Sequence, residues 1–198
     1  PWFDDDSGPV YWWCPSERGV IQPGQMKVSR SLKKTLRSDK FHITADENFA
    51  SVISACAATR ANTVGTWITP AMMTAYEELH LAGLAHSIEV WQDETLVGGL
   101  YGLSLGNMFF GESMFSRRSN ASKIALTHLI ARLYYAGYTL LDAQFSNDHL
   151  MQFGLEEIPK EIFKARLAEA LSAPAAFPSD ISEDMALAYL AQVRTDTS

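Results

Sequence analysis

Three consecutive segments with strand-like composition constrain this chain most, because only turn-length gaps separate them. They are HSIEVW at 86–91, LVGGLYGLSL at 96–105 and MFFGESMF at 108–115. The gaps hold QDET and the pair Gly106 and Asn107, both typical of tight turns. Strands joined so closely pair antiparallel, since a parallel pair needs a crossover of a dozen or more residues. The segments therefore predict an antiparallel meander.

A helix, a strand and further helices are predicted after the meander. Apolar residues at helical spacing cover about 120–136, and Gly137 is a typical helix stop. The segment YTLLDAQ at 138–144 has the composition of another strand, and helices are predicted around 159–171 and 183–194. The central order is strand, strand, strand, helix, strand, which predicts an α+β fold.

Two helices are predicted before the meander. Asp46 is a suitable N-cap for a helix whose apolar residues begin at Phe49. Thr69 followed by Pro70 is typical of a second helix start, and Gly83 of its end. The chain shows no internal repeat.

The composition is that of a packed globular domain. Apolar residues make up 47% of the 198 residues and charged residues 20%, which excludes a disordered or collagen-like chain. No apolar run approaches the roughly 20 residues of a membrane span, and the first residues lack the pattern of a signal peptide. We therefore expect a cytoplasmic protein without a membrane partner. Cys14 and Cys56, without a C-x-x-C pair, predict neither a disulfide framework nor a metal site.

Charge is unevenly distributed along the chain. The net charge is -7, yet one short segment carries six basic residues and a single acidic one, Asp39. On a helix, four of the six share one face and suit the phosphates of a nucleic acid, whereas the alternative is an ordinary solvated helix face. The six are Lys27, Arg30, Lys33, Lys34, Arg37 and Lys40, and the four are Arg30, Lys33, Lys34 and Arg37.

The central order of elements is similar to that of the GCN5-related acetyltransferase superfamily, an acyl-transfer fold. Its members hold the pyrophosphate of coenzyme A on a glycine-rich turn before the helix. Here that junction, at 116–123, reads SRRSNASK and contains no glycine. The resemblance implies an acetyltransferase-like catalytic domain over 17–198. The junction without glycine predicts that this domain uses no cofactor, and a coenzyme A-dependent acyltransferase is the alternative. Residues 1–16 are expected to be the remainder of a small N-terminal domain whose preceding segment is missing.

A series of motifs from Pro1 to about Phe163 resembles the bacterial leucyl/phenylalanyl-tRNA-protein transferases. The blocks are PWF, YWWCP, SRSLKK, GTWIT, HSIEVW, LVGGLYG, GESMFSR, NASKIAL, LLDAQ with NDH, and EIP. The resemblance implies an aminoacyltransferase that moves Leu or Phe, and in some members Met, from aminoacyl-tRNA to the N-terminal Arg or Lys of acceptor proteins. Such proteins are then marked for N-end rule degradation. A noncatalytic tRNA-binding module is the alternative from another class.

The resemblance implies two sets of donor-binding residues. Trp2 and Trp67 match family tryptophans near the 3'-terminal adenosine, where stacking on a base is worth about 1 to 3 kcal/mol. The alternative is a core cluster, which we prefer for Trp12 and Trp13. The aminoacyl pocket is implied to be apolar, with leucines at some positions where the family often has aromatic residues or Met. Its residues are Leu100, Phe109, Met114, Leu126, Leu129, Leu133 and Leu141.

Asp142, Gln144 and Glu112 are the implied catalytic residues. Asp142 and Gln144 are two apart on a predicted strand, so we expect their side chains to share a face and hydrogen-bond one another. Asp142 would orient Gln144, whose neutral amide aligns the attacking α-amine rather than acting as a true base. Glu112 is either a paired structural carboxylate or faces the cleft, where it attracts the cationic acceptor or holds the donor's amino group. His149, beside a helix cap at Asn147, is an alternative proton-transfer group.

The resemblance also supplies a partner for the basic helix. Phosphates of a tRNA acceptor stem would meet Arg30, Lys33, Lys34 and Arg37, and contacts to the backbone let one enzyme accept several tRNA species. The ester of aminoacyl-tRNA is already activated, so positioning and stabilisation of the developing oxyanion suffice for peptide-bond formation. The reaction therefore requires neither a metal nor a covalent intermediate.

Overall fold

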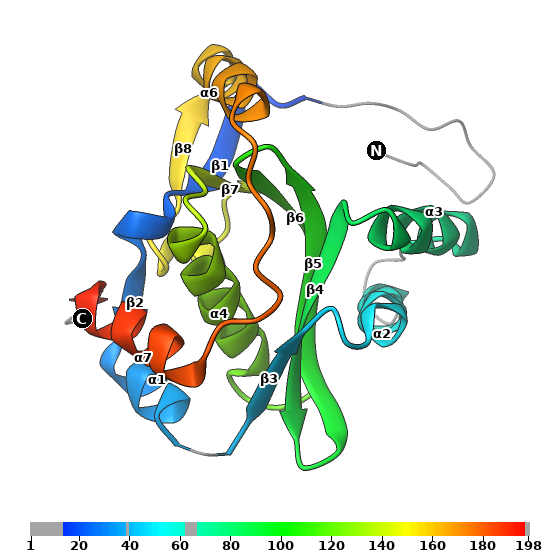
Figure 1. Ribbon diagram of the computed structural model, residues 1–198, viewed down its shortest axis with the longest axis vertical. Helices are drawn as coiled ribbons and strands as arrows, with labels where there is room; N and C mark the ends of the chain where they lie inside the picture. Colours follow the sequence, from blue (N-terminus) through cyan, green and yellow to red (C-terminus); the bar gives the residue numbers. More distant parts are fainter. Residues whose placement is uncertain (1–13, 39, 62–66, 197–198) are drawn as a thin grey trace.

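The computed structural model describes residues 14–38, 40–61 and 67–196, which build one large sheet with helices on both faces (Figure 1). Neighbouring strands follow the order β3, β4, β5, β6, β7, β1, β8. All neighbouring pairs are antiparallel except β6 with β7, which is parallel. The strands are β1 (Glu17–Ile21), β3 (His42–Ala45), β4 (Ala85–Gln92), β5 (Thr95–Leu105), β6 (Met108–Ser116), β7 (Leu140–Gln144) and β8 (Glu156–Pro159).

The helices lie on two sides of this sheet. Figure 1 shows α4 crossing one face, with α1 and α7 packed beside it, while α2 and α3 cover the other face. A short parallel pair, β2 (Lys27–Ser29) with β9 (Arg194–Asp196), forms a second sheet. The helices are α1 (Arg30–Leu36), α2 (Phe49–Ala61), α3 (Pro70–Leu81), α4 (Ala121–Tyr135), α5 (Asp148–Met151), α6 (Lys160–Ser172) and α7 (Glu183–Gln192), with a 3-10 turn at Pro23–Gln25.

The predicted meander is confirmed as β4, β5 and β6, and α4 and β7 follow in the predicted order. Asp93 and Gly106 take the left-handed conformation in the two connecting turns, with φ of 52° and 58°. Gly106 also passes so close to the carbonyl oxygen of Ala170 that a Cβ atom would overlap it. The fold is therefore of the mixed α+β class, with a mostly antiparallel sheet.

One predicted helix cap is confirmed and another is wrong. The hydroxyl of Thr69 accepts a backbone N–H of the first turn of α3, as expected. Asp46 does not cap α2, because Asn48 takes that place by accepting the N–H of Ser51 at 3.2 Å. Oδ2 of Asp46 instead lies 2.7 Å from Nδ1 of His86, which belongs to the neighbouring strand β4.

Three strands of the large sheet were not predicted. β1, β3 and β8 have only four or five residues each, too few for a strand period to stand out from the surrounding loops. Residues 1–13 lie outside the described part of the chain, so the boundary between 1–16 and 17–198 stays a prediction. Among the described residues, no helix is long and apolar enough to cross a membrane.

Candidate active site

A cavity opens where β6 and β7 stop pairing. Met108, Phe109 and Phe110 lie opposite Leu140, Leu141 and Asp142 in the parallel register. Past these pairs, Gly111 and Glu112 of β6 and Ala143 of β7 line a cavity of about 180 Å³. Gln144 is not among its lining residues, but its amide bonds directly to Gly111 and Glu112 beside the cavity. The site therefore lies at the one parallel junction of the large sheet, with α4 as its floor.

The cavity is lined by five of the seven residues predicted for the aminoacyl pocket. Phe109 and Leu133 are not among the lining residues and are fully buried in the main core. Phe109 belongs to the stretch in which β6 and β7 still pair, and Leu133 lies one turn beyond Leu129 along α4. The five are Leu100, Met114, Leu126, Leu129 and Leu141.

Glu112 reaches the cavity because β6 carries a bulge. Tyr101 lies opposite Ser113 and Gly102 lies opposite Gly111, so Glu112 is the extra residue without a partner on β5. Its carboxylate accepts a hydrogen bond from the hydroxyl of Tyr76 on α3. Burial raises the pKa of Glu112 above its ordinary value, and the hydrogen bonds from Tyr76 and Gln144 oppose that rise. Glu112 is thus both a bonded carboxyl and a cavity-lining residue.

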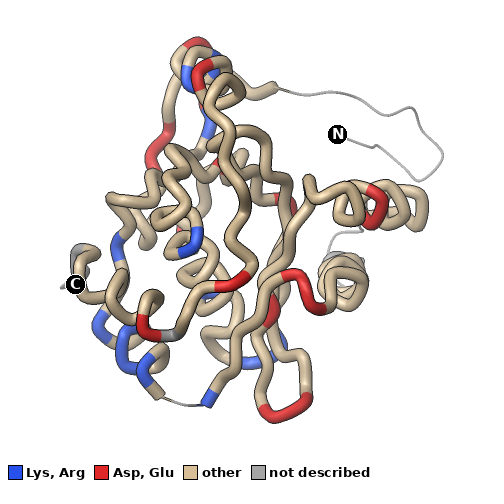
Figure 2. Tube along the Cα trace, in the orientation of Figure 1, with Lys and Arg blue, Asp and Glu red and all other residues tan. Residues whose placement is uncertain are grey.

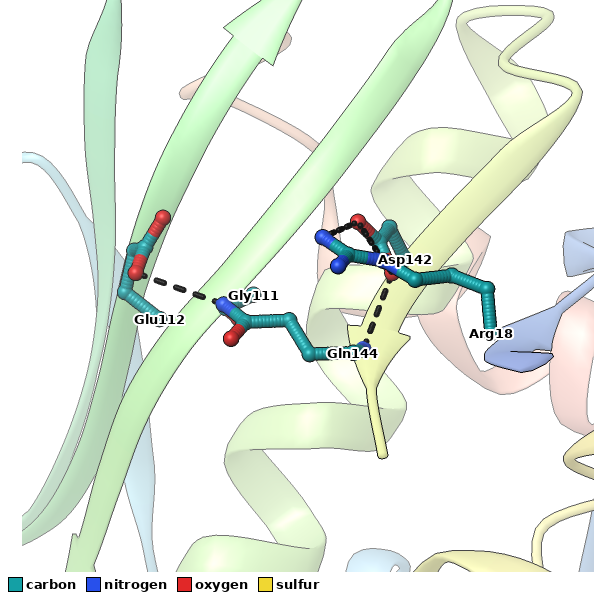
Figure 3. Close-up of polar contacts among 5 residues, drawn as sticks. All are labelled: Arg18, Gly111, Glu112, Asp142 and Gln144. Carbon is teal, nitrogen blue, oxygen red and sulfur yellow. Dashed lines mark hydrogen bonds and ion pairs between the residues drawn. The ribbon is translucent and has the colours of Figure 1, made fainter. Parts of the chain in front are cut away.

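Gln144 ends β7 in a left-handed conformation, with φ of 67°. Its Nε2 donates to the carbonyl oxygen of Gly111 at 3.0 Å and to Oε2 of Glu112 at 3.4 Å, as Figure 3 shows for the carboxylate. The carbonyl oxygen of Gly111 only accepts hydrogen bonds, so the Nε2 end of the amide must face it. The Oε1 end is then the one that can accept a proton donor from a substrate.

The prediction of a hydrogen bond between the side chains of Asp142 and Gln144 is wrong. Oδ1 of Asp142 accepts the backbone N–H of Gln144 at 2.9 Å, while the Gln144 amide turns toward β6. The positive φ of Gln144 bends the chain away from the regular alternation on which that expectation relied. Asp142 is fully buried and forms an ion pair with Arg18 at 2.8 Å (Figure 3). Arg18 could not be predicted from the sequence, because no local pattern links it to β7.

The short helix α5, which follows β7, contributes residues to the wall of the cavity. The side chain of Asn147 caps α5 by accepting the N–H of Leu150 at 2.9 Å, which confirms the predicted cap. His149 lines the cavity, and its pKa is lowered by burial and by the nearby Lys123. His149 is therefore favoured in its neutral form at neutral pH.

Of the two tryptophans predicted for the adenosine, the structure describes Trp67, which is not among the lining residues of this cavity. Trp67 is half-buried and packs against the cluster formed by α2, α3 and the sheet. Trp2, like Trp12 and Trp13, lies outside the described residues. Adenosine binding by Trp2 and Trp67 therefore stays a prediction.

The basic face of α1 is exposed at three of its four predicted positions. Arg30, Lys34 and Arg37 are exposed, and Figure 2 shows the basic residues gathered along this helix. Lys33 departs from the prediction, because its Nζ is turned inward and donates to the carbonyl oxygen of Val193 at 3.0 Å. Burial and the nearby Arg37 lower the pKa of Lys33. Helical spacing alone does not show that α7 ends beside this position.

A larger cavity of about 420 Å³ lies between β3, α4 and the segment before α7. Arg132 lines it and is buried, which lowers the pKa of its guanidinium, and the charges of Glu89, Asp46 and Asp180 oppose that shift. Its His128 has its pKa lowered to about 3 by burial, so the ring is neutral at pH 7. None of the predicted site residues that the structure describes lines this cavity, and we assign the site to the smaller one. Among the described residues, no cluster of three metal-ligating side chains occurs.

The cavity thus combines aliphatic walls with the buried carboxyl of Glu112, and the amide of Gln144 is fixed beside it. Residues 20–168 match the family model described as "Leucyl/phenylalanyl-tRNA protein transferase". The chain belongs to this family and is an aminoacyltransferase. The resemblance found in the sequence motifs is thereby confirmed.

Curated relatives agree with this assignment. One from Ectopseudomonas mendocina is 50% identical over 174 residues, covering 88% of this chain and 76% of the relative. One from Nitrosospira multiformis is 51% identical over 172 residues, covering 87% of this chain and 74% of the relative. Both are named leucyl/phenylalanyl-tRNA--protein transferase.

A comparison with solved structures also finds much more distant proteins. A functionally unknown conserved protein from Staphylococcus epidermidis has 10% sequence identity and a TM-score of 0.43, over 72% of this chain and 57% of its own. A likeness at this level assigns no fold family. The acetyltransferase-like core therefore stays a prediction.

Proposed function

We propose that this chain transfers Leu or Phe from aminoacyl-tRNA to the N-terminal Arg or Lys of acceptor proteins, and so marks them for N-end rule degradation in the cytoplasm. The observation that carries the proposal is the cavity at the β6–β7 junction. It combines an apolar interior with Glu112 at its rim and the Gln144 amide bonded to that carboxylate. Membership of the transferase family supplies the chemistry for which these groups are suited.

The donor's side chain would occupy the apolar part of the cavity. Leu100, Leu126 and Leu129 provide aliphatic walls, and none of them can hydrogen-bond a polar side chain. Such a pocket favours an apolar amino acid but separates similar ones weakly, since one methylene changes discrimination by only about 1 to 3 kcal/mol. Acceptance of Leu, Phe and Met by the same site follows from this weak discrimination.

The acceptor's α-amine would be aligned by Gln144. With Nε2 held by Gly111 and Glu112, Oε1 accepts a hydrogen bond from the amine and directs its lone pair toward the ester carbonyl. The new C–N bond forms, the bond to the ribose oxygen breaks, and the amine proton passes to that leaving oxygen. Glu112, when ionised, would favour the cationic N-terminus of an Arg or Lys acceptor.

The tRNA would be held mainly through its backbone. Arg30 and Lys34 on α1 and Arg37 at its C-cap are exposed, and both α1 and the cavity are built against α4. Cations on a helix face bind phosphates without reading base sequence, which suits an enzyme that selects the amino acid rather than the tRNA body.

The test is transfer of radiolabelled Leu and Phe from charged tRNA to an Arg-initiated peptide without coenzyme A. A Met-initiated peptide is the matched control for the acceptor. We expect label on the Arg peptide alone. Binding of tRNA without transfer to either peptide would instead support the noncatalytic module, and transfer only on addition of acyl-coenzyme A would support the acetyltransferase alternative.

A further inference from the structure

Arg18 forms the most extensive ion pair around the candidate site. Its Nε donates to Oδ1 and Oδ2 of Asp142 at 3.0 and 3.1 Å, and its Nη2 donates to Oδ2 at 2.8 Å. The side chain of Asp142 is fully buried, and that of Arg18 is 16% exposed. A guanidinium held by two oxygens of one carboxylate fixes the plane of that carboxylate, which a single ammonium does not.

The guanidinium of Arg18 is itself held from a second side. Its central carbon lies 5.0 Å from the ring centroid of Phe163, which α6 presents to β1 as a buried residue. An arginine over an aromatic face gains a cation–π attraction, and its N–H donors lie in the guanidinium plane, where they can still bond a carboxylate. Its position on β1 and the contact with Phe163 of α6 therefore hold the Arg18 side chain in the orientation in which it reaches β7.

The carboxylate fixed by Arg18 in turn fixes the backbone of Gln144. Val20 and Gly19 of β1 lie opposite Asp142 and Gln144, so Ala143 is an extra residue on β7. At this bulge Gln144 has φ of 67°, a conformation that a non-glycine residue keeps only when its surroundings impose it. The N–H of Gln144 donates to Oδ1 of Asp142, the same oxygen that accepts Nε of Arg18.

The close approach of β1 adds to this constraint. An added Cβ on Gly19 would lie 3.0 Å from the carbonyl carbon of Phe145 and 3.1 Å from the nitrogen of Ser146. The chain leaving Gln144 therefore passes directly over β1. The close packing at Gly19 and the Arg18–Asp142 pair both hold the end of β7 against β1.

We propose that Arg18 is a positioning residue for aminoacyl transfer, acting through Asp142 to hold Gln144 in the left-handed conformation that aims its amide at the acceptor amine. This inference rests on the proposed function and adds to it a residue from β1. Asp142 in this arrangement neither exchanges a proton with Gln144 nor contacts its side chain. Its carboxylate accepts hydrogen bonds from both the guanidinium of Arg18 and the backbone N–H of Gln144, and so links the two.

The first experiment compares transfer by the wild-type protein with Arg18→Met and Arg18→Lys. Arg18→Met should lower kcat by about 100-fold, the size of effect that a small misplacement in an active site can produce. KM for aminoacyl-tRNA should stay within about twofold, because Arg18 is outside the donor cavity and away from α1. Arg18→Lys should recover part of kcat, since it restores the charge without the two-point contact.

Arg166→Met is the matched control variant. Arg166 lies on α6 and pairs with Glu156 at 3.6 Å, with both side chains well exposed, so removing it changes the charge by the same amount without touching β7. It should transfer like the wild type. Thermal unfolding of every variant, checked against the assay temperature, separates loss of fold from loss of alignment.

A second measurement does not depend on transfer activity. In the amide NMR spectrum, the backbone N–H of Gln144 should shift in Arg18→Met and in Asp142→Asn, and should keep its wild-type position in Arg166→Met. An unmoved Gln144 resonance in folded Arg18→Met would overturn the inference even for a protein without transferase activity. An Arg18→Met variant that transfers normally would overturn it as well, whereas an inactive wild-type protein with the expected shift would overturn only the proposed function.

Discussion

The end of β7 and the basic face of α1 place polar groups in opposite ways. At the end of β7, Asp142 is fully buried and Gln144 is held at several points, so each group has one position. On α1, Arg30 and Lys34 are exposed on a helix surface, where long side chains keep their freedom. The end of β7 therefore depends on the exact placement of each group, so a single substitution should abolish its effect. The basic face of α1 depends on its summed charge, which a single substitution only reduces.

The largest expected effect tests the geometric region. Gln144→Ala should lower kcat by about 100-fold and leave KM for aminoacyl-tRNA nearly unchanged, because alignment of the amine is lost while the donor cavity stays intact. Steady-state transfer to an Arg-initiated peptide measures both constants, with Gln92→Ala at the end of β4 as the control. A change confined to KM would place Gln144 in binding and remove the contrast with α1.

The next effect concerns the wall of the cavity. Leu129→Phe puts a ring into a space of about 180 Å³ and should reduce use of Phe relative to Leu by about 10-fold. Competition between the two charged tRNAs in one reaction measures the ratio directly. Equal losses for both donors would show that Leu129 supports the fold rather than the donor side chain.

A smaller effect is expected for the exposed cations of α1. Lys34→Gln should weaken tRNA binding a few-fold and lower the slope of log affinity against log salt by about 1, because one phosphate contact is lost. Lys33→Met is the internal comparison, since the Lys33 amine is bonded to Val193. It should lower the thermal stability and leave the salt slope as it is. A lower salt slope in Lys33→Met with an unchanged slope in Lys34→Gln would mean that tRNA contacts Lys33 rather than Lys34.

The smallest expected effect is a change in the pH dependence of folding stability, which Glu112 causes in the geometric region. Burial raises the pKa of Glu112 above 4.5, so the folded protein loses stability as pH rises through the raised pKa. Glu112→Gln has no such loss and should be more resistant to urea than the wild type, with a gap that widens from pH 4 to pH 7. Transfer should fall in the same variant. A gap that narrows with rising pH would show that Glu112 is stabilised as a carboxylate.

Much of the fold was predictable from local patterns in the chain. Long apolar segments with turn residues between them gave the meander, and periodic leucines gave α4, since these signals come from neighbours in sequence. The cavity walls Leu100, Leu126 and Leu129 were predicted through the family resemblance. What could not be predicted was the bulge at Glu112, because its position depends on how β5 and β6 pair.

The sequence by itself determined the order of elements, the basic segment and the residues that resemble those of a transferase. Only the tertiary structure decided which of these residues meet. Arg18 pairs with Asp142 across 124 positions of the chain, and Lys33 turns from the basic face toward Val193, which lies 160 positions away. Hydrophobic and turn patterns act between near neighbours, whereas an ion pair or a buried amine depends on which distant strand or helix end packs beside it.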